Sequence, residues 1–231
     1  MGTTASIHVN DDISEPDFFD AVASVRTELE RLEEIFTVYK DTSEISRINS
    51  GELHHLDASS EVIEVLDKCA WLEQASGGAF SIRRSRTATR INPSGFVKGW
   101  AAERASALLG SAGLEHWYLG VGGDFVLHGG LTDNESWSIG IADPRDATQL
   151  VATVSVMSGA VATSGSAERG QHIWNPRTGA PANEFLSVTV VGPELAWADA
   201  YATTIYVMGE AGLEWVKQFE HYVAMPVRRD D

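Results

Sequence analysis

A short apolar strand followed at once by a helix constrains the fold of this chain more than any other stretch. Ser187 to Val191 is an apolar, β-branched run that predicts a strand, and Gly192-Pro193 ends it. A helix-compatible segment follows from Leu195. Within it, Asp199 and Thr203 are four residues apart, so they project from one face of the predicted helix.

The Asp199/Thr203 pair can be explained in two ways. A carboxylate and a hydroxyl at this spacing are hard oxygen ligands, which suit Mg²⁺ or Ca²⁺ better than zinc. Alternatively, Asp199 stabilises the first turn of the helix through the helix dipole, and Thr203 bonds back to a backbone carbonyl. The pair does not decide between these explanations without the rest of the chain.

Two amphipathic patterns predict long helices. In residues 14–36, apolar side chains recur at alternating spacings of four and three, and in residues 60–75 a similar stripe ends at Gly77-Gly78. Shorter helices are predicted for residues 43–49, capped by Ser43, and for residues 100–109 and 210–219. Strands are predicted for residues 1–9, 79–82, 137–142, 150–156, 160–165 and 221–227, and for two pieces around Gly122-Gly123-Asp124.

This order of elements predicts the α+β class, with mixed, mainly antiparallel sheets packed with the two long helices. Residues 1–231 are expected to form one domain, and a division into two intertwined lobes stays open. The formal net charge is −16, which excludes a general nucleic-acid or anionic-membrane binder. A phosphorylated ligand would therefore need local help from a cation or from aimed backbone N–H groups.

Two segments could give such help. Residues 83–90 hold four of the 17 basic residues, and they form either a solvated loop or a loop that faces an anion. Residues 92–99 form a turn of small residues before a helix, where unpaired N–H groups and Lys98 could face a phosphate. Two single residues also have alternatives: Tyr39 either covers a planar ligand or belongs to the core, and His172 is either structural or functional.

The chain contains one cysteine, Cys69, so it cannot form an internal disulfide, and the apolar surroundings predict a buried thiol. No run of 18 or more apolar residues predicts a membrane span, and no charged-then-apolar segment opens the sequence. The expected location is the cytoplasm, unless the chain is an exported form from which a leader has been removed.

Eight ordered blocks together resemble the FAD:protein FMN transferases, the ApbE family. The blocks are Met1-Gly2-Thr3, residues 39–49 with Ser43-Glu44-Ile45-Ser46-Arg47-Ile48-Asn49, Gly78-Ala79-Phe80-Ser81-Ile82, residues 92–99, Gly122-Gly123-Asp124, Ala162-Thr163-Ser164-Gly165, His172-Ile173-Trp174-Asn175-Pro176-Arg177-Thr178-Gly179, and residues 199–203. They span essentially the whole chain. The resemblance implies an ApbE-like fold of the alpha-beta roll type.

The resemblance also implies an activity. FAD would be cleaved at its pyrophosphate, FMN would be joined through a phosphoester to a threonine hydroxyl of an acceptor flavoprotein, and AMP would leave. The Mg²⁺ ligands implied by the resemblance are the side chains of Asp199 and Thr203 and the backbone carbonyl of Gly95. His172 would be the candidate base, with Asp199 as the second catalytic residue. The implied flavin contacts are Met1, Tyr39, Ala79, Phe80, Ser81, Asn92, Lys98 and Ile173.

The chain departs from the family pattern at one wall of the implied site. Asn92 and Ser81 stand where the family pattern has aspartate. Pro93 and Ser94, the two residues after Asn92, also differ from the family pattern. Only 11 residues separate Phe80 from Asn92, where the family usually has a much longer insertion. Two alternatives therefore stay open: hydrolysis of FAD to FMN and AMP, and binding of FAD by a protein that has lost transfer.

Overall fold

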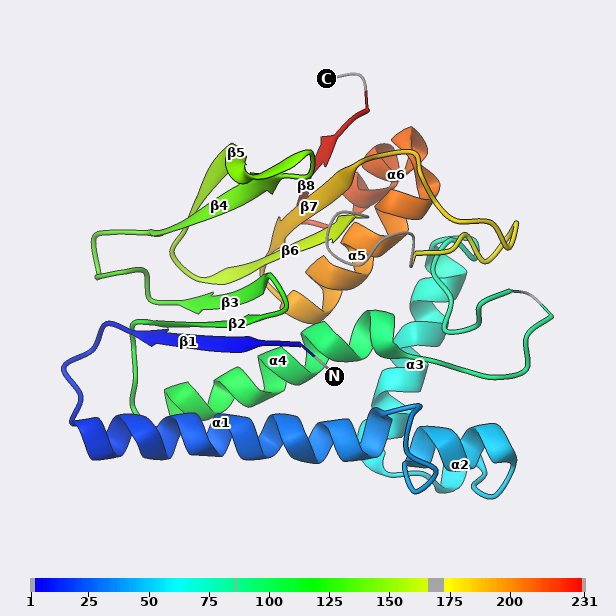
Figure 1. Ribbon diagram of the computed structural model, residues 1–231, viewed down its shortest axis with the longest axis horizontal. Coiled ribbons are helices and arrows are strands. Elements are labelled where there is room, and N and C mark those ends of the chain that lie inside the picture. Colours follow the sequence, from blue (N-terminus) through cyan, green and yellow to red (C-terminus); the bar gives the residue numbers. More distant parts are fainter. Residues whose placement is uncertain (1–2, 86, 166–172, 230–231) are drawn as a thin grey trace.

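The computed structural model describes residues 3–85, 87–165 and 173–229, and it is built around a six-stranded antiparallel sheet (Figure 1). The strand order is β1-β2-β3-β6-β7-β8. The bounds are β1 Ala5–Val9, β2 Trp117–Val121, β3 Asp124–His128, β6 Gly159–Gly165, β7 Ser187–Gly192 and β8 Val223–Val227. Strands β4 (Trp137–Asp143) and β5 (Asp146–Val156) form a separate two-stranded sheet.

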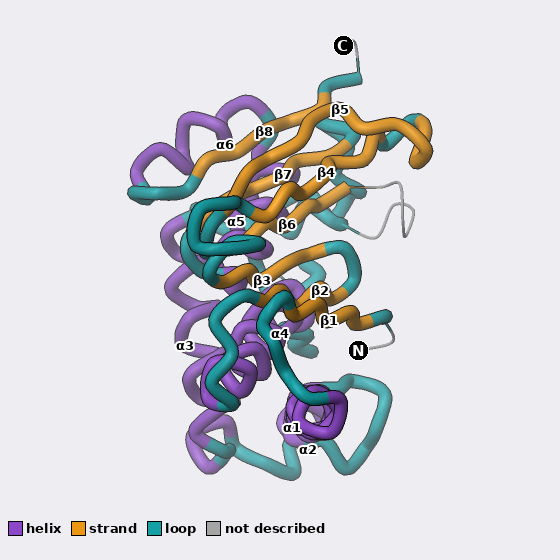
Figure 2. Tube along the Cα trace, turned by 90° about the vertical axis from the view of Figure 1, so that its left-hand side faces the viewer, coloured by secondary structure: helices purple, strands orange, loops and turns teal. Residues whose placement is uncertain are grey.

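Helices cover one face of the six-stranded sheet, as the side view in Figure 2 shows. Their bounds are α1 Glu15–Phe36, α2 Glu44–Ser50, α3 Ser60–Ala75, α4 Ser94–Ser111, α5 Leu195–Met208 and α6 Glu210–Trp215, with short 3₁₀ helices at His55–Asp57 and Val216–Gln218. Helices α4 and α5 pack against the sheet, and α1 packs against α4. The predicted α+β class is confirmed, because antiparallel sheets pack with long helices.

Successive side chains along a strand point to opposite faces of the sheet, so each strand contributes to two separate cores. In β3, Val126 packs toward the helices, whereas Leu127 belongs to the core beneath the β4–β5 hairpin. In β6, Ala160 and Ala162 face the helices, and Val161 between them faces the hairpin. The hairpin therefore covers part of the face of the sheet opposite the helices.

A close approach at Gly99 brings α4 and α5 together. A Cβ atom at this glycine would lie 2.6 Å from the carbonyl oxygen of Leu195, so no larger residue fits without moving one of the helices. Residues Gly95, Gly99 and Glu103 lie four apart on α4, so one face of this helix follows α5 from its first turn onward. The α5 helix is buried on nearly all sides, as expected for a helix that is apolar almost all round.

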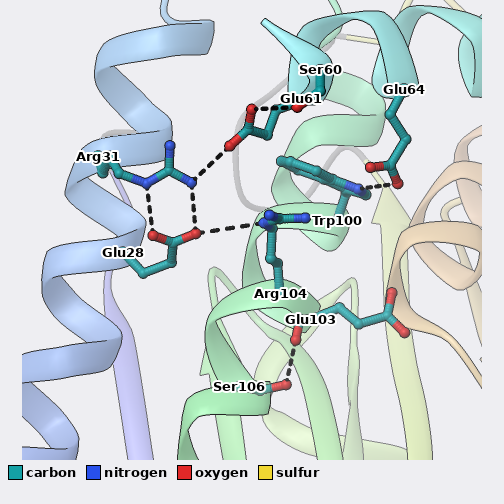
Figure 3. Close-up of polar contacts among 9 residues, drawn as sticks. All are labelled: Glu28, Arg31, Ser60, Glu61, Glu64, Trp100, Glu103, Arg104 and Ser106. Atoms are coloured by element: carbon teal, nitrogen blue, oxygen red, sulfur yellow. Dashed lines mark hydrogen bonds and ion pairs between the residues drawn. The ribbon is translucent and has the colours of Figure 1, made fainter.

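An ion-pair cluster joins the outer helices (Figure 3). Arg31 on α1 donates to Glu28 at 2.8 and 2.9 Å and to Glu61 on α3 at 3.2 Å. Arg104 on α4 reaches Glu28 at 3.6 Å. These side chains are partly solvated, so the cluster aligns the three helices and contributes little free energy for each pair.

Glu103 lies beside this cluster in a different environment. Its Oε2 atom accepts from the backbone N–H of Ala196 at 3.4 Å, at the first turn of α5. Burial raises the pKa of Glu103 to about 7, the Ala196 N–H opposes this rise, and the charge of Glu194 adds to it. The folded protein therefore holds a proton here at pH values where the unfolded chain, with its ordinary carboxyl pKa, has released it.

A glutamine at position 103 is expected to change how stability depends on pH. Between about pH 4.5 and pH 7 the unfolded chain loses the Glu103 proton before the folded protein does, so stability falls as the pH rises. Glu103→Gln removes this titration. The difference in unfolding free energy between the variant and the parent should therefore shift by about 1 kcal/mol in favour of the variant when the pH is raised from 4.5 to 8. Urea unfolding at both pH values measures this difference. The exposed Glu220→Gln is the control, and a parallel pH dependence of Glu103→Gln and the parent would refute the prediction.

Several predicted boundaries were wrong. Helix α4 begins at Ser94 rather than Trp100, because Pro93 ends the preceding loop and the side chain of Asn92 accepts from the Ser94 N–H at 3.1 Å. Residues 79–82 form a loop instead of a strand. The first strand begins at Ala5, β5 begins at Asp146, and β8 begins at Val223. Among the described residues, no helix combines the length and the apolar character that crossing a membrane requires.

Candidate functional site

A cavity of about 1260 Å³ opens between the sheet, the start of α4 and the β4–β5 hairpin. Its wall includes the loop after α1, residues 79–84, the β2–β3 turn, the β4–β5 turn, strand β6, residues 173–176 and one face of α5. The cavity is at least as large as typical sites for drug-sized ligands. It is therefore large enough for a dinucleotide.

The structure brings the predicted site residues together at this cavity. Ten of them lie in the described part of the chain, and all ten line the cavity wall: Tyr39, Ala79, Phe80, Ser81, Asn92, Gly95, Lys98, Ile173, Asp199 and Thr203. The other two, Met1 and His172, lie outside the described residues. Residues from distant parts of the sequence thus meet at one place.

A buried cluster of one cation and two carboxylates forms the floor of the cavity. The Lys98 ammonium forms an ion pair with Oδ2 of Asp124 and lies 3.4 Å from Oδ1 of Asp199. Asp124 is 1% exposed and Asp199 is 3% exposed. Two carboxylates so far from water require a positive charge beside them. The three charged groups come from the start of α4, the start of β3 and α5.

The pKa values at this cluster follow from burial and from the neighbouring charges. Burial lowers the pKa of Lys98, but the carboxylates of Asp199 and Asp124 outweigh burial and leave the pKa above its ordinary value. Burial raises the pKa of Asp124 to about 7, Asp199 adds to the rise, and Lys98 opposes it. Lys98 is therefore charged at neutral pH, and the cluster is a place where positive charge is held.

Hydroxyl groups from strand β6 complete this part of the wall. Ser164 Oγ lies 2.9 Å from Thr203 Oγ1, and the Thr163 N–H donates to Asp124 Oδ1 at 2.8 Å. No role had been predicted for Asp124, Thr163 or Ser164. They do occur in the Gly-Gly-Asp and Ala-Thr-Ser-Gly blocks, and those blocks were the only signal in the sequence.

The cluster offers a donor set that fits a hard divalent cation. Asp199 and Thr203 lie on one face of α5 and line the cavity with Gly95, which lies one turn before Lys98 on α4. The described residues contain no group of three or more His, Cys, Asp or Glu side chains suited to enclose a metal. One carboxylate, one hydroxyl and a carbonyl match the way proteins bind Mg²⁺, which keeps waters and takes further oxygens from a phosphorylated substrate.

The rest of the wall combines apolar and polar side chains. Tyr39 is 93% exposed, so the alternative of a core tyrosine was wrong, and its ring is free to cover a ligand at the rim. Ala79 and Phe80 are buried behind the cavity surface. Ser81 donates to Glu73 of α3 at 3.1 Å, and Asn92 accepts from the start of α4, so both departures from the family pattern bond to the protein itself.

Asn49 fixes the segment that carries Asn92. Its Oδ1 atom accepts from the Ile91 N–H at 2.7 Å, and its Nδ2 atom donates to the Ile91 carbonyl at 2.9 Å. This pair of bonds joins α2 to the residue that precedes Asn92. The Asn92 N–H donates to the carbonyl of Ile82 at 2.7 Å, which closes the base of the 83–91 loop.

Removal of the Asn49 side chain is expected to lower the free energy of unfolding by about 2 kcal/mol, because Asn49→Ala leaves two backbone groups of the buried Ile91 without these partners. Urea unfolding measures the loss. Asn134→Ala, at an exposed site, should stay within about 0.5 kcal/mol of the parent. An Asn49→Ala protein as stable as the Asn134→Ala control would show that the two bonds contribute nothing to stability.

The basic segment, residues 83–90, was predicted to be either a solvated loop or a loop that faces an anion, and each alternative is correct for part of it. Arg83 and Arg84 line the cavity, whereas Thr87 and Arg90 are exposed and lie outside its wall. The first part of the segment therefore faces the site, and the described remainder of it is solvated.

The fold and the cavity define an α+β protein that holds a buried lysine between two aspartates below a dinucleotide-sized space. A model of the ApbE family matches residues 1–86 and 81–225, and the chain belongs to this family.

Curated relatives and solved structures agree with this family. FAD:protein FMN transferase of Vibrio cholerae is 32% identical over 152 residues, which cover 61% of this chain and 46% of the relative. The same-named protein of Rhodobacter capsulatus is 34% identical over 56% of this chain and 26% of its own length. The matched part of the chain thus spans less than half of these curated relatives.

The solved structures match over nearly the whole chain. The flavin transferase ApbE of Vibrio cholerae has a TM-score of 0.84 at 22% identity, covering 100% of this chain and 92% of that one. The ApbE protein of Thermotoga maritima has a TM-score of 0.85 at 22% identity, covering 99% and 92%. At this identity the structures establish the fold.

Proposed function

We propose that the protein transfers the FMN moiety of FAD to a threonine hydroxyl of an acceptor flavoprotein, with Mg²⁺ bound and with release of AMP. The observation that carries this proposal is the buried cluster of Lys98, Asp124 and Asp199 in a cavity that Gly95 and Thr203 also line. The names of the curated relatives support the same reaction.

The proposal includes a cytoplasmic site of action, which fractionation of the source cells would test.

The proposed reaction is a phosphoryl-group transfer. The threonine oxygen attacks the phosphorus of the FMN half, a new P–O bond forms, and the bond from that phosphorus to the bridging oxygen of AMP breaks. The hydroxyl proton passes to a base, for which we propose His172. Gly165 and Ile173, on either side of the segment that contains His172, both line the cavity, which supports this assignment.

Different residues of this chain would bind the metal ion and the flavin. The Asp199 carboxylate, the Thr203 hydroxyl and the Gly95 carbonyl would hold the Mg²⁺ ion, which when bound would neutralise charge on the diphosphate. Lys98, charged at neutral pH, would hold the two aspartates beside it through ion pairs. The flavin would lie along Ala79, Phe80 and Ile173, with Tyr39 over its exposed side and with polar contacts from Ser81, Asn92 and the segment at Met1.

One specific observation favours a second candidate, FAD binding without transfer. Asn92 and Ser81 stand where the family pattern has carboxylates, and both bond to neighbouring parts of the protein. FAD hydrolysis is the third possibility, in which water replaces the threonine hydroxyl.

One incubation distinguishes all three. The protein is mixed with FAD, Mg²⁺ and an acceptor flavoprotein domain, and the products are analysed by intact-protein mass spectrometry and by separation of nucleotides. Transfer predicts an acceptor heavier by one FMN together with free AMP. Free FMN with AMP would indicate hydrolysis, and unchanged bound FAD would indicate binding alone. Either of the last two outcomes would overturn the proposed function.

A further inference from the structure

A cation–π contact between two side chains joins two loops at the wall of the cavity. The guanidinium carbon of Arg84 lies 4.1 Å from the centroid of the Trp174 ring, and both residues line the cavity. Arg84 belongs to the 83–91 loop, and Trp174 belongs to residues 173–182. The two residues are 90 positions apart in the sequence, so tertiary structure alone brings the pair together.

Backbone hydrogen bonds close the segments that carry Arg84 and Trp174. The Asn92 N–H donates to the Ile82 carbonyl at 2.7 Å and closes the loop that carries Arg84. Around Trp174, the Ala182 N–H donates to the Ile173 carbonyl at 3.0 Å, and the Asn175 N–H donates to the Ala180 carbonyl at 2.8 Å. The indole is half-buried. It therefore offers a fixed surface against which the longer, exposed arginine side chain can pack.

The contact with the ring positions the guanidinium and leaves hydrogen-bond donors for a ligand. A cation–π contact is made with the face of the ring, and a guanidinium carries five N–H donors, so donors remain for a second partner. Within the part of the chain that the structure describes, the Arg84 side chain has no hydrogen bond and no ion pair with a carboxylate. In a protein with a net charge of −16, an arginine at a cavity wall with its donors unused is suited to an anionic ligand.

We infer that Arg84, held against the ring of Trp174, is a phosphate-binding specificity residue of this cavity. The inference rests on the proposed function, because that function gives the cavity a ligand with two linked phosphates. The planar fork of an arginine matches phosphate oxygens in pairs, so the interaction selects phosphorylated ligands over their unphosphorylated analogues. Lys98, in the cluster at the floor, also lines the cavity, so Arg84 adds a second positive charge for a charged substrate.

The test measures affinity for ligands that differ only in phosphate. Titration calorimetry with FAD, FMN, AMP and riboflavin is carried out on the parent protein and on Arg84→Ala. We expect Arg84→Ala to weaken FAD binding about tenfold, the usual size of one charge-assisted hydrogen-bonding contact, and to leave riboflavin binding unchanged. A comparable loss for FMN assigns Arg84 to the flavin-side phosphate, and a comparable loss for AMP assigns it to the adenylate-side phosphate.

Three further variants test the role of the contact between Arg84 and Trp174. Arg84→Lys keeps the charge but loses the planar fork, and it should recover only a small part of the lost FAD affinity. Trp174→Leu should weaken FAD binding in the same direction, and adding it to Arg84→Ala should cause little further loss, because the two residues act as one unit. Arg90→Ala is the matched control, since Arg90 lies in the same loop and outside the cavity wall.

Two results would overturn the inference: an Arg84→Ala protein that binds FAD as tightly as the parent, or one that loses riboflavin and FAD affinity equally. Thermal unfolding of each variant shows whether it is folded, and the Arg84→Lys comparison uses a side chain that keeps the loop charge. Failure of the proposed function gives a different result, because the incubation described above would then yield no acceptor heavier by one FMN, whether or not Arg84→Ala weakens FAD binding.

Discussion

Replacement of Asp199 by asparagine is expected to lower the rate of FAD cleavage by about a thousandfold or more. The Asp199→Asn substitution keeps the shape of the side chain and removes the one charged oxygen ligand that α5 contributes to the proposed Mg²⁺ site. A loss of several kcal/mol of transition-state stabilisation corresponds to this factor. Release of AMP over time, measured by chromatography at saturating Mg²⁺, gives the rate.

The fold should survive this substitution. Lys98 keeps its ion pair with Asp124 when Asp199 is neutralised, and the repulsion that helps to raise the pKa of Asp124 is removed. Asp67→Asn, at an exposed position on α3, is the matched control and should retain full activity. If Asp199→Asn cleaved FAD as fast as this control, the assignment of Asp199 to the metal and to catalysis would be wrong.

Replacement of Lys98 by methionine is expected to produce the largest loss of stability, about 3 kcal/mol. Methionine fills a similar volume but leaves two buried carboxylates without the cation that lies between them. Breaking a buried ion pair from one side is strongly destabilising, because the remaining charge is still desolvated. Urea unfolding at pH 8, where Asp124 would otherwise be ionised, measures the effect.

Two comparisons separate this cause from ordinary loss of a side chain. Lys217→Met removes an exposed lysine that pairs with Glu214 at 2.6 Å, and it should change stability by less than about 0.5 kcal/mol. Adding Asp124→Asn to Lys98→Met should restore part of the stability, since it removes one of the two stranded charges. Equal losses for Lys98→Met and Lys217→Met would contradict the buried-cluster explanation.

Regular elements with a strong periodic pattern could be predicted from the sequence. The apolar stripe of residues 14–36 corresponds to α1, with Val25 and Leu32 buried, and Ser14 caps this helix. The strand–helix stretch that carries Asp199 corresponds to β7 and α5. Cys69 is buried, as its apolar neighbours predicted. In each case local spacing alone decides which face is buried, so no knowledge of distant partners is needed.

Features that depend on distant contacts could not be predicted in this way. The predicted start of α4 was six residues too late, because the glycine and serine residues in positions 94–99 are poor helix formers. Gly99 allows α4 to pack closely against α5, and this benefit depends on a tertiary contact that the local sequence does not reveal. Residues 79–82 have a strand-like composition but no strand partner among the described residues. The ion pair between Lys98 and Asp124 joins residues 26 positions apart, and no local pattern indicates it.

The most direct test of the central claim is the affinity of the parent protein for FAD with and without Mg²⁺, measured by titration calorimetry. If a divalent ion held by Gly95, Asp199 and Thr203 binds the diphosphate, Mg²⁺ should tighten FAD binding at least about tenfold, and FAD should tighten Mg²⁺ binding by the same factor. Riboflavin, which has no phosphate, should bind equally well in both conditions, and Asp199→Asn should abolish the Mg²⁺ effect. Equal FAD affinity in Mg²⁺ and in excess EDTA would contradict the account.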